Sequence, residues 1–488
     1  MQWVSRQSQI SQLLLASAVG LLLGSIIVAI SGLGITTRLF VVLVGGLAGV
    51  IVMFLTRDLK RLLVLVICSD VTTSLDFHVT CNDDYFLSSC GFNISVALLA
   101  LIPLYVMWII DIRRGKDRPT SPKTRFDIIG ALALIFLAAV LISIGVAKRP
   151  DLAVFQFWIY AGMFLTFFYL SNYIRDREAL LFVVYSLTFT IGLQLLIMEL
   201  QLFGVIEPAS ESPMWIGRIT GTLITPNRAG GFLAQMLMIM LAALLLKIPR
   251  MYRIGIGIMT IITAHALVAT ESRGAWSAAL IGLVIIGVLG VWKRWIGLRA
   301  LILALLILSA VGALVSGQII TRLTEDDRGA AEARGPLAEI ASNMIWRNPV
   351  TGVGINNFGI VLHDYIEAEQ LGAWLHLVHN GWLLIWSETG TIGFVIYAAF
   401  RIALLWQAFW LIRKGDRTIG IVALGLFASM IGGGIHMTVE IYSSRNLIQI
   451  IWIDAALVSA MMGIQKLEMT QATPNRTLVT KANKGIRV

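Results

Sequence analysis

Two polar residues, His379 and Asn380, directly precede a long run of hydrophobic residues in this sequence. An imidazole has an unperturbed pKa of about 6.5, so it is well suited to take a proton from a hydroxyl group at neutral pH. His376 lies about one helical turn away. His379 is therefore a candidate general base, and the alternative is an amphipathic side chain that only anchors the helix at a membrane interface.

Glu388 follows His379 by nine residues and falls within the same apolar run. Nine steps of about 100° place it on nearly the opposite face of a continuous helix. A direct contact between the two side chains would therefore require a helix break at Gly390 or Gly393. Acids inside membrane segments are candidates for function, and the alternative role of Glu388 is to cap or bridge neighbouring helices.

Ten arginines and a single lysine, Lys148, lie in the segments predicted to face the outside of the membrane, and the arginines include Arg218, Arg228 and Arg273. A guanidinium presents a planar fork of donors that matches phosphate oxygens, whereas lysine is a point charge. These arginines are therefore candidates for binding a phosphorylated lipid head group. The arginines between Thr324 and Arg334 have acidic neighbours and are expected to pair with them at the surface.

The composition of the sequence predicts that membrane helices carry these side chains. Hydrophobic residues make up 57% of the 488 residues and charged residues only 14%, and the mean hydropathy is +0.83. A helix needs about 20 apolar residues to cross a bilayer, so the sequence predicts an all-α, polytopic transmembrane helical bundle of about 12–14 spans. The predicted spans lie near 9–30, 39–56, 62–77, 95–111, 127–146, 152–172, 179–204, 229–247, 254–270, 275–292, 300–318, 380–412, 418–437 and 447–463.

The net charge of +10 is a signal of topology. Most Lys and Arg fall in the loops on the side of the two termini, which places both termini in the cytoplasm by the positive-inside rule. The partner implied by this charge is the lipid bilayer, and nucleic acid is excluded. The candidate residues then face the opposite, external side of the membrane.

The predicted organisation has five parts. They are N-terminal transmembrane helices (1–204), helices with the arginine motifs (205–317), a long external loop (318–378), C-terminal helices with the His-Asn motif (379–465) and a cytoplasmic tail (466–488). In the external loop, Leu337, Ile340, Ala341, Met344 and Ile345 recur at helical spacing. They predict an amphipathic helix over 336–346 that lies on the membrane, caps a cavity or packs as a lid. The following NPVTGVGINNFG predicts a turn-rich loop.

Cys81 and Cys90 share one predicted external loop, where a disulfide can form in an oxidising compartment, while Cys68 lies in or beside a span. The sequence has no CxxC, HExxH or paired Cys/His spacing, so it predicts no metal site and no cofactor. His265 is expected to be a satisfied histidine of the helical bundle. His436, in an external turn with Glu440, either lines the entrance for an acceptor or packs at a helix end.

Four ordered elements between residues 218 and 395 carry a resemblance to a known family. They are RITGTLITPN, ESRGAW, the segment from Trp346 to Phe358, and His-Asn followed by Leu383, Glu388, Gly390 and Gly393. Together they resemble the O-antigen ligase and O-antigen polymerase superfamily of bacterial membrane glycosyltransferases. The first two hundred residues match only as generic membrane spans.

The resemblance implies transfer of a glycan from a polyprenyl (undecaprenyl) pyrophosphate to an acceptor hydroxyl at the external leaflet of the bacterial inner membrane. The reaction would invert the anomeric carbon and need no metal. His379 would be the general base, and Arg273 with Arg218 or Arg228 would bind the pyrophosphate and stabilise it as it leaves. Asn227, Asn380 and Glu388 would position these groups.

The acceptor distinguishes the members of this superfamily. A ligase transfers the glycan to a lipopolysaccharide core, a polymerase transfers it to another lipid-linked repeat unit, and a third branch transfers it to protein Ser or Thr. The intact motifs favour the ligase, with the polymerase of O-antigen or exopolysaccharide as the alternative. A polyprenyl-glycan transporter or flippase is the competing class, and it predicts charged groups along the spans at midplane depth.

Overall fold

The computed structural model describes residues 58–73, 76–80, 89–114, 125–207, 217–302, 316–324, 334–367 and 375–484, with single positions between some of these ranges. The predicted spans at 9–30 and 39–56, and most of 300–318, lie outside the described residues. Almost all of the described chain that is not loop is helical. The predicted all-α, polytopic helical bundle is confirmed.

Within the described ranges, nine helices are long and apolar enough to cross a membrane. They are α4 (Val96–Arg113), α6 (Pro150–Tyr173), α7 (Arg177–Leu202), α8 (Pro226–Leu244), α9 (Arg250–Ala269), α10 (Arg273–Trp292), α15 (Gly381–Lys414), α16 (Arg417–His436) and α17 (Arg445–Lys484, apolar over Arg445–Thr470). Two further helices, α3 (Leu59–Thr73) and α5 (Ile128–Ile144), are shorter. The chain is a multi-pass membrane protein.

The predicted span at 62–77 differs from the structure. Helix α3 ends at Thr73, and the chain then enters strand β1 (Asp76–Val79), which pairs antiparallel with β2 (Phe92–Ser95). Each strand has only four residues, which is too short for an alternating pattern to stand out in the sequence. Cys90, in the connection between the strands, is disulfide-bonded. Cys68 is a free, buried thiol, and Cys81 lies outside the described residues.

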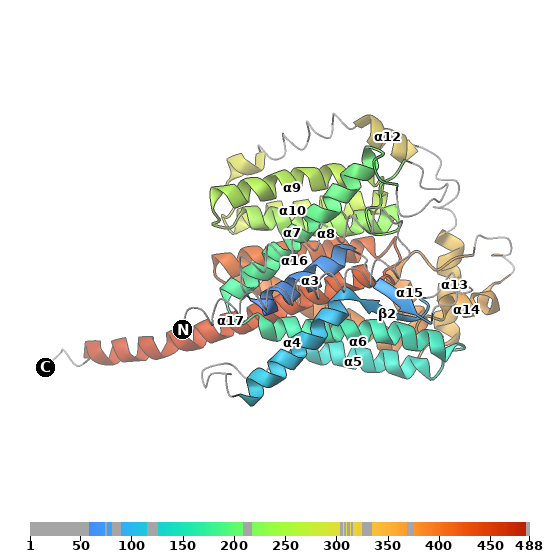
Figure 1. Cartoon of the computed structure of the whole chain (residues 1–488), viewed down its shortest axis with the longest axis horizontal. Helices are drawn as coiled ribbons and strands as arrows, with labels where there is room; N and C mark the ends of the chain where they lie inside the picture. Colours follow the sequence, from blue (N-terminus) through green and yellow to red (C-terminus); the bar gives the residue numbers. More distant parts are fainter. Residues whose placement is uncertain are drawn as a thin grey trace, which may run out of the picture.

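Helix α8 lies at the centre of the bundle, packed against α9, α10 and α16, while α15 packs against α5 and α16, and α17 packs against α6 (Figure 1). Small residues allow the close approach of these helices. A Cβ added at Gly425 of α16 would lie 2.7 Å from Cβ of Ala242 in α8, and one added at Gly230 of α8 would lie 2.8 Å from Cβ of Ala275 in α10. Helix α7 crosses the others obliquely, and α17 extends beyond them at one end (Figure 1).

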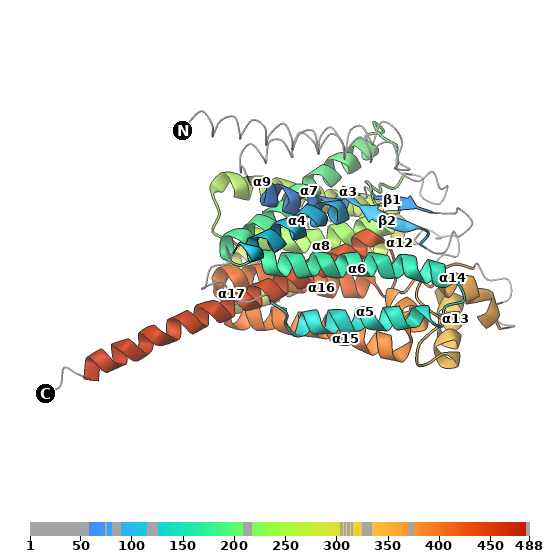
Figure 2. The ribbon, with the colours of Figure 1, turned by 60° about the horizontal axis from the view of Figure 1, so that its bottom comes forward.

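The connections that carry the candidate residues gather at the other end, here called the site end. Figure 2 shows there the β1–β2 pair, α12 (Ser316–Thr324), α13 (Arg334–Arg347) and α14 (Phe358–Val361), which continues into the 3₁₀ helix η2 (Leu362–Tyr365). The helix predicted over 336–346 is confirmed as α13. Its five apolar side chains are buried, and four of them (Leu337, Ile340, Ala341 and Met344) belong to a small second core with Phe358, Leu362 and Val378. They pack within the protein and are not available to lie on the bilayer.

Candidate functional site

Arg218 lies in the turn that leads into α8, and its side chain is buried. Its Nε donates a hydrogen bond to Thr270 O at 2.9 Å, and its Nη2 donates to Asn227 Oδ1 at 3.1 Å. These bonds fasten the guanidinium between the ends of α8 and α9. Burial, and next the charge of Arg322, lowers the pKa of Arg218 to about 10, so the side chain remains a cation at neutral pH.

Arg273 is the first residue of α10, and the preceding Ser272 caps this helix with its hydroxyl. Glu271 adopts a left-handed backbone conformation with φ of 51°. Its carboxylate lies 4.0 Å from Nε of Arg218 and 4.0 Å from Nε of Arg322. The α9–α10 corner therefore brings two arginines, Arg218 and Arg322, to one acid, and the charge of Arg273 acts on Arg218.

The loop before α15 is held by its backbone. The Asn380 side chain caps the helix by accepting hydrogen bonds from two N–H groups of its first turn. The Gly381 N–H donates to Met437 O at 2.7 Å and to Glu440 O at 3.0 Å. Asn380 therefore fixes the start of α15, and Gly381 fastens that start to the turn between α16 and α17.

His376 and His379 lie side by side in this loop, with ring centroids 5.2 Å apart and planes inclined by 20°. Burial is the main cause that lowers the pKa of His379 to about 4, and the charges of His376, Arg334 and Arg228 add to it. Burial also lowers the pKa of His376. His379 is therefore neutral at pH 7 and has a nitrogen lone pair that can accept a proton.

Arg228 is the candidate phosphate-binding arginine whose charge acts on both histidines of this loop. It follows Thr225, which caps α8, and its charge acts on His376, on His379 and on the Glu440 carboxylate. Its Nε is buried and has no hydrogen-bond partner among the described residues. We call Arg218, Arg228, Arg273, Arg322 and Arg334 the arginine cluster.

Glu440 is a site residue that sequence reasoning missed. It lies in the turn between α16 and α17 and is buried. Burial raises the pKa of the Glu440 carboxyl, and Arg228 and the hydrogen-bonding side chain of Asn227 oppose that rise. Asn227 therefore bridges Arg218 and Glu440. The only signal in the sequence was an acid near His436 in a glycine-rich turn, and it did not show which arginine lies opposite.

Glu388 lies on the other side of the His-Asn loop, buried in α15. Its Oε1 accepts a hydrogen bond from the Phe358 N–H at 3.2 Å. Helix α15 does break, at Gly390, where φ is 68° and ψ is −178°. The break lies beyond Glu388, where the turn-rich loop packs against α15. There the Val353 N–H donates a hydrogen bond to Ser387 O at 2.9 Å. The carboxylate turns toward this loop.

Residues 258–398 match the protein family described as O-Antigen ligase. The chain carries a domain of that family. The family recognised from the sequence motifs is thereby confirmed, and the matched segment includes Arg273, His379 and Glu388. A comparison with curated proteins finds no match.

The O-antigen ligase segment covers only part of the residues that meet at the site. Arg218 and Arg228 precede it, and Glu440 follows it. Helices α8 and α16, which bring these residues to the site, pack against each other and against α10. The candidate site therefore combines three parts of the sequence: the residues before the matched segment, the matched segment itself, and the turn after α16.

Two other histidines have structural partners. His265 Nδ1 lies 3.0 Å from the Glu199 carboxylate, so it is satisfied as expected, although on the outside of the bundle. His436 is buried, and its Nδ1 lies 3.1 Å from the Tyr442 hydroxyl. Within the described ranges, no group of three His, Cys, Asp or Glu side chains is placed to hold a metal ion.

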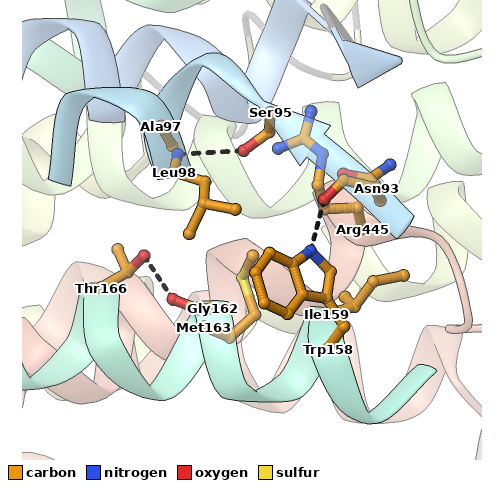
Figure 3. A pocket seen from close by; sticks show the side chains of 10 residues that line it. All are labelled: Asn93, Ser95, Ala97, Leu98, Trp158, Ile159, Gly162, Met163, Thr166 and Arg445. Atoms are coloured by element: carbon orange, nitrogen blue, oxygen red, sulfur yellow. Dashed lines mark hydrogen bonds between the residues drawn. The ribbon is translucent and has the colours of Figure 1, made fainter. Parts of the chain in front are cut away.

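Several other arginines at the site end form ion pairs. Arg149 lies 2.6 Å from Asp151, and Arg347 lies 3.0 Å from Glu367. Arg445 is buried at the start of α17, beside Asn93 and Trp158 (Figure 3), and its Nη1 donates to Asp70 Oδ2 at 2.6 Å. These three arginines are paired with carboxylates of the protein and are not candidates for substrate binding.

Proposed function

We propose that this multi-pass membrane protein is an O-antigen ligase-like glycosyltransferase. It transfers a glycan from a polyprenyl pyrophosphate to an acceptor hydroxyl at the external face of the bacterial inner membrane, with both termini in the cytoplasm. The observation that carries the proposal is a neutral histidine, His379, within electrostatic reach of Arg228 and Arg334. The family match supports the reaction class.

The chemistry follows from the two kinds of group. Neutral His379 accepts the proton of the acceptor hydroxyl as its oxygen attacks the anomeric carbon. The bond from that carbon to the pyrophosphate oxygen breaks, and the electron pair leaves with the pyrophosphate. A single displacement of this kind inverts the anomeric carbon.

The arginine cluster supplies the positive charge that the leaving group requires. Arg218, Arg228 and Arg273 bind the pyrophosphate and stabilise the charge that develops on it, which is the work that a divalent metal does in many other transferases. Asn227 positions the Arg218 guanidinium through their hydrogen bond. Asn380 holds the start of α15, and Glu388 orders the loop at 356–358.

The experiment that tests the proposal is glycan transfer by the purified protein in nanodiscs. The donor is a polyprenyl-pyrophosphate-linked oligosaccharide, the acceptors are lipid A core, a second donor molecule and a peptide, and EDTA is in excess. We expect His379→Ala to lower the transfer rate about 10²- to 10⁴-fold, the usual contribution of a positioned base. Arg273→Ala is expected to lower it about 10²-fold.

Matched controls separate the site from general damage. His265→Ala removes a histidine paired with Glu199, and Arg347→Ala removes an arginine paired with Glu367. Both should transfer at the wild-type rate. Normal transfer by His379→Ala would refute the site, and the productive acceptor decides between ligase and polymerase.

A polyprenyl-glycan transporter is the second candidate, because two charged residues lie deep in the bundle. Arg401 of α15 and Asp454 of α17 are both buried, and Arg401 donates to Met430 O at 3.1 Å. If the wild-type protein transfers glycan to no acceptor but moves the lipid-linked glycan between leaflets, the transporter replaces the transferase.

A further inference from the structure

A cavity of about 170 Å³ lies behind the His-Asn loop, between α6, α8, α15 and the turn before α17. Leu377 and Gly381 border it, so it reaches the loop that carries His379. The polar side chains on its walls include Gln156, Tyr160, Arg228, Asn356, Glu388 and Tyr442. No motif of the sequence pointed to a cavity here.

Two of these side chains present polar atoms that the protein leaves unused. Gln156 is 3% exposed, and its Oε1 has no hydrogen-bond partner among the described residues. The buried Nε of Arg228 likewise has no hydrogen-bond partner among the described residues. A buried polar atom without a partner is unfavourable, so both atoms favour a ligand that forms hydrogen bonds.

We propose that this cavity binds one sugar ring of the substrate. The inference rests on the proposed function, since it concerns the same site. Sugar hydroxyls both donate and accept hydrogen bonds, which suits an amide, a carboxylate and a guanidinium on facing walls. The apolar faces of Tyr160, Ile355 and Leu384 suit the C–H face of such a ring.

Arg228 places this ring relative to the proposed base and the proposed pyrophosphate site. The same side chain lines the cavity and acts on His379. A ring held here therefore lies next to the pyrophosphate and to the base. The ring belongs either to the donor, as the sugar attached to the pyrophosphate, or to the acceptor.

Helix α6 then determines substrate specificity. Gln156 and Tyr160 belong to the first two hundred residues, outside the O-antigen ligase match at 258–398. The shared motifs perform the reaction, while a residue from a generic membrane span selects the sugar. Proteins of this family that share all four motifs are expected to differ in sugar preference when position 156 differs.

The test uses the full chain in nanodiscs and two variants. Gln156→Met keeps the length of the side chain and removes its hydrogen-bonding groups, and Tyr160→Phe removes one hydroxyl. The probes are polyprenyl pyrophosphate without sugar and the same lipid carrying its glycan. We expect Gln156→Met to weaken binding of the glycan-bearing lipid about five- to tenfold, with binding of the sugar-free lipid unchanged.

Thr166→Val is the matched control, because Thr166 is a buried residue of α6 whose Oγ1 donates to Gly162 O at 2.9 Å, away from this cavity. The Thr166→Val variant should bind both lipids with the affinity of the wild type. Tyr160→Phe should act in the same direction as Gln156→Met and provides the answer if Gln156→Met does not fold.

The outcomes are distinct. Weaker binding of the glycan-bearing lipid assigns the ring to the donor. Unchanged donor binding with a raised acceptor KM assigns it to the acceptor, and both results support the cavity. Folded variants with wild-type binding and acceptor KM overturn this inference alone, as does an equal loss for the sugar-free lipid. A wild-type protein that binds neither lipid overturns the proposed function and this inference together.

Discussion

The low pKa of His379 makes a quantitative prediction about the pH dependence of glycan transfer. Burial and the neighbouring positive charges lower this pKa from 6.5 to about 4. One pKa unit corresponds to about 1.36 kcal/mol, so the site disfavours the imidazolium by about 3 kcal/mol relative to water. The base form of His379 therefore persists well below neutral pH.

The expected difference is large at pH 5.5. A histidine with a pKa of about 4 is about 97% neutral at this pH, whereas a solvent-exposed one with a pKa of about 6.5 is only about 9% neutral. We expect kcat/KM for the donor to stay nearly constant from pH 8 to about 5 and to fall tenfold per pH unit below about 4. Arg334→Gln removes a positive charge near His379, so it should move this acid limb to higher pH.

The assay is the initial rate of glycan transfer in nanodiscs across this pH range, with monodispersity checked at every point. This check is needed because acid also weakens the fold: a histidine held neutral in the protein binds a proton on unfolding, so stability falls as the pH drops below 6.5. An acid limb near pH 6.5 would refute the argument from burial. The same limb in the residual activity of His379→Gln would show that another group titrates.

Three further predictions concern other residues. Glu440→Gln removes the carboxylate that balances Arg228 and should lower the donor KM about two- to tenfold, whereas a lower kcat with constant KM would assign Glu440 to the chemistry. Gly390→Ala should abolish folded protein in size-exclusion chromatography, because its Cβ would lie 2.2 Å from Val350 O at a positive φ; Gly255→Ala, in open space on α9, should fold normally. Asp70→Asn should lower stability by about 3–5 kcal/mol by leaving Arg445 buried without its counter-ion, and an unchanged melting temperature would contradict this.

The helices of this protein could be predicted from its sequence alone. Long apolar runs separated by charged loops can only be membrane helices, because the bilayer leaves backbone groups no other partner. Local signals also marked the helix over 336–346 and the positions of Arg273 and His379 at the ends of apolar runs. The ordered motifs identified the family, since they require no knowledge of how distant segments pack.

Which of these residues meet follows from the packing of the helices and could not be read from the sequence. Arg228 and His379 belong to α8 and to the loop before α15, and Glu440 reaches them from the turn after α16. Arg445 and Asp70 form a buried ion pair across 375 positions of the sequence. Such contacts depend on which faces of the helices pack together, and the uniformly apolar spans carry almost no pattern that distinguishes one face from another. The same reason hid the cavity beside Gln156, whose walls come from three helices and four connecting segments.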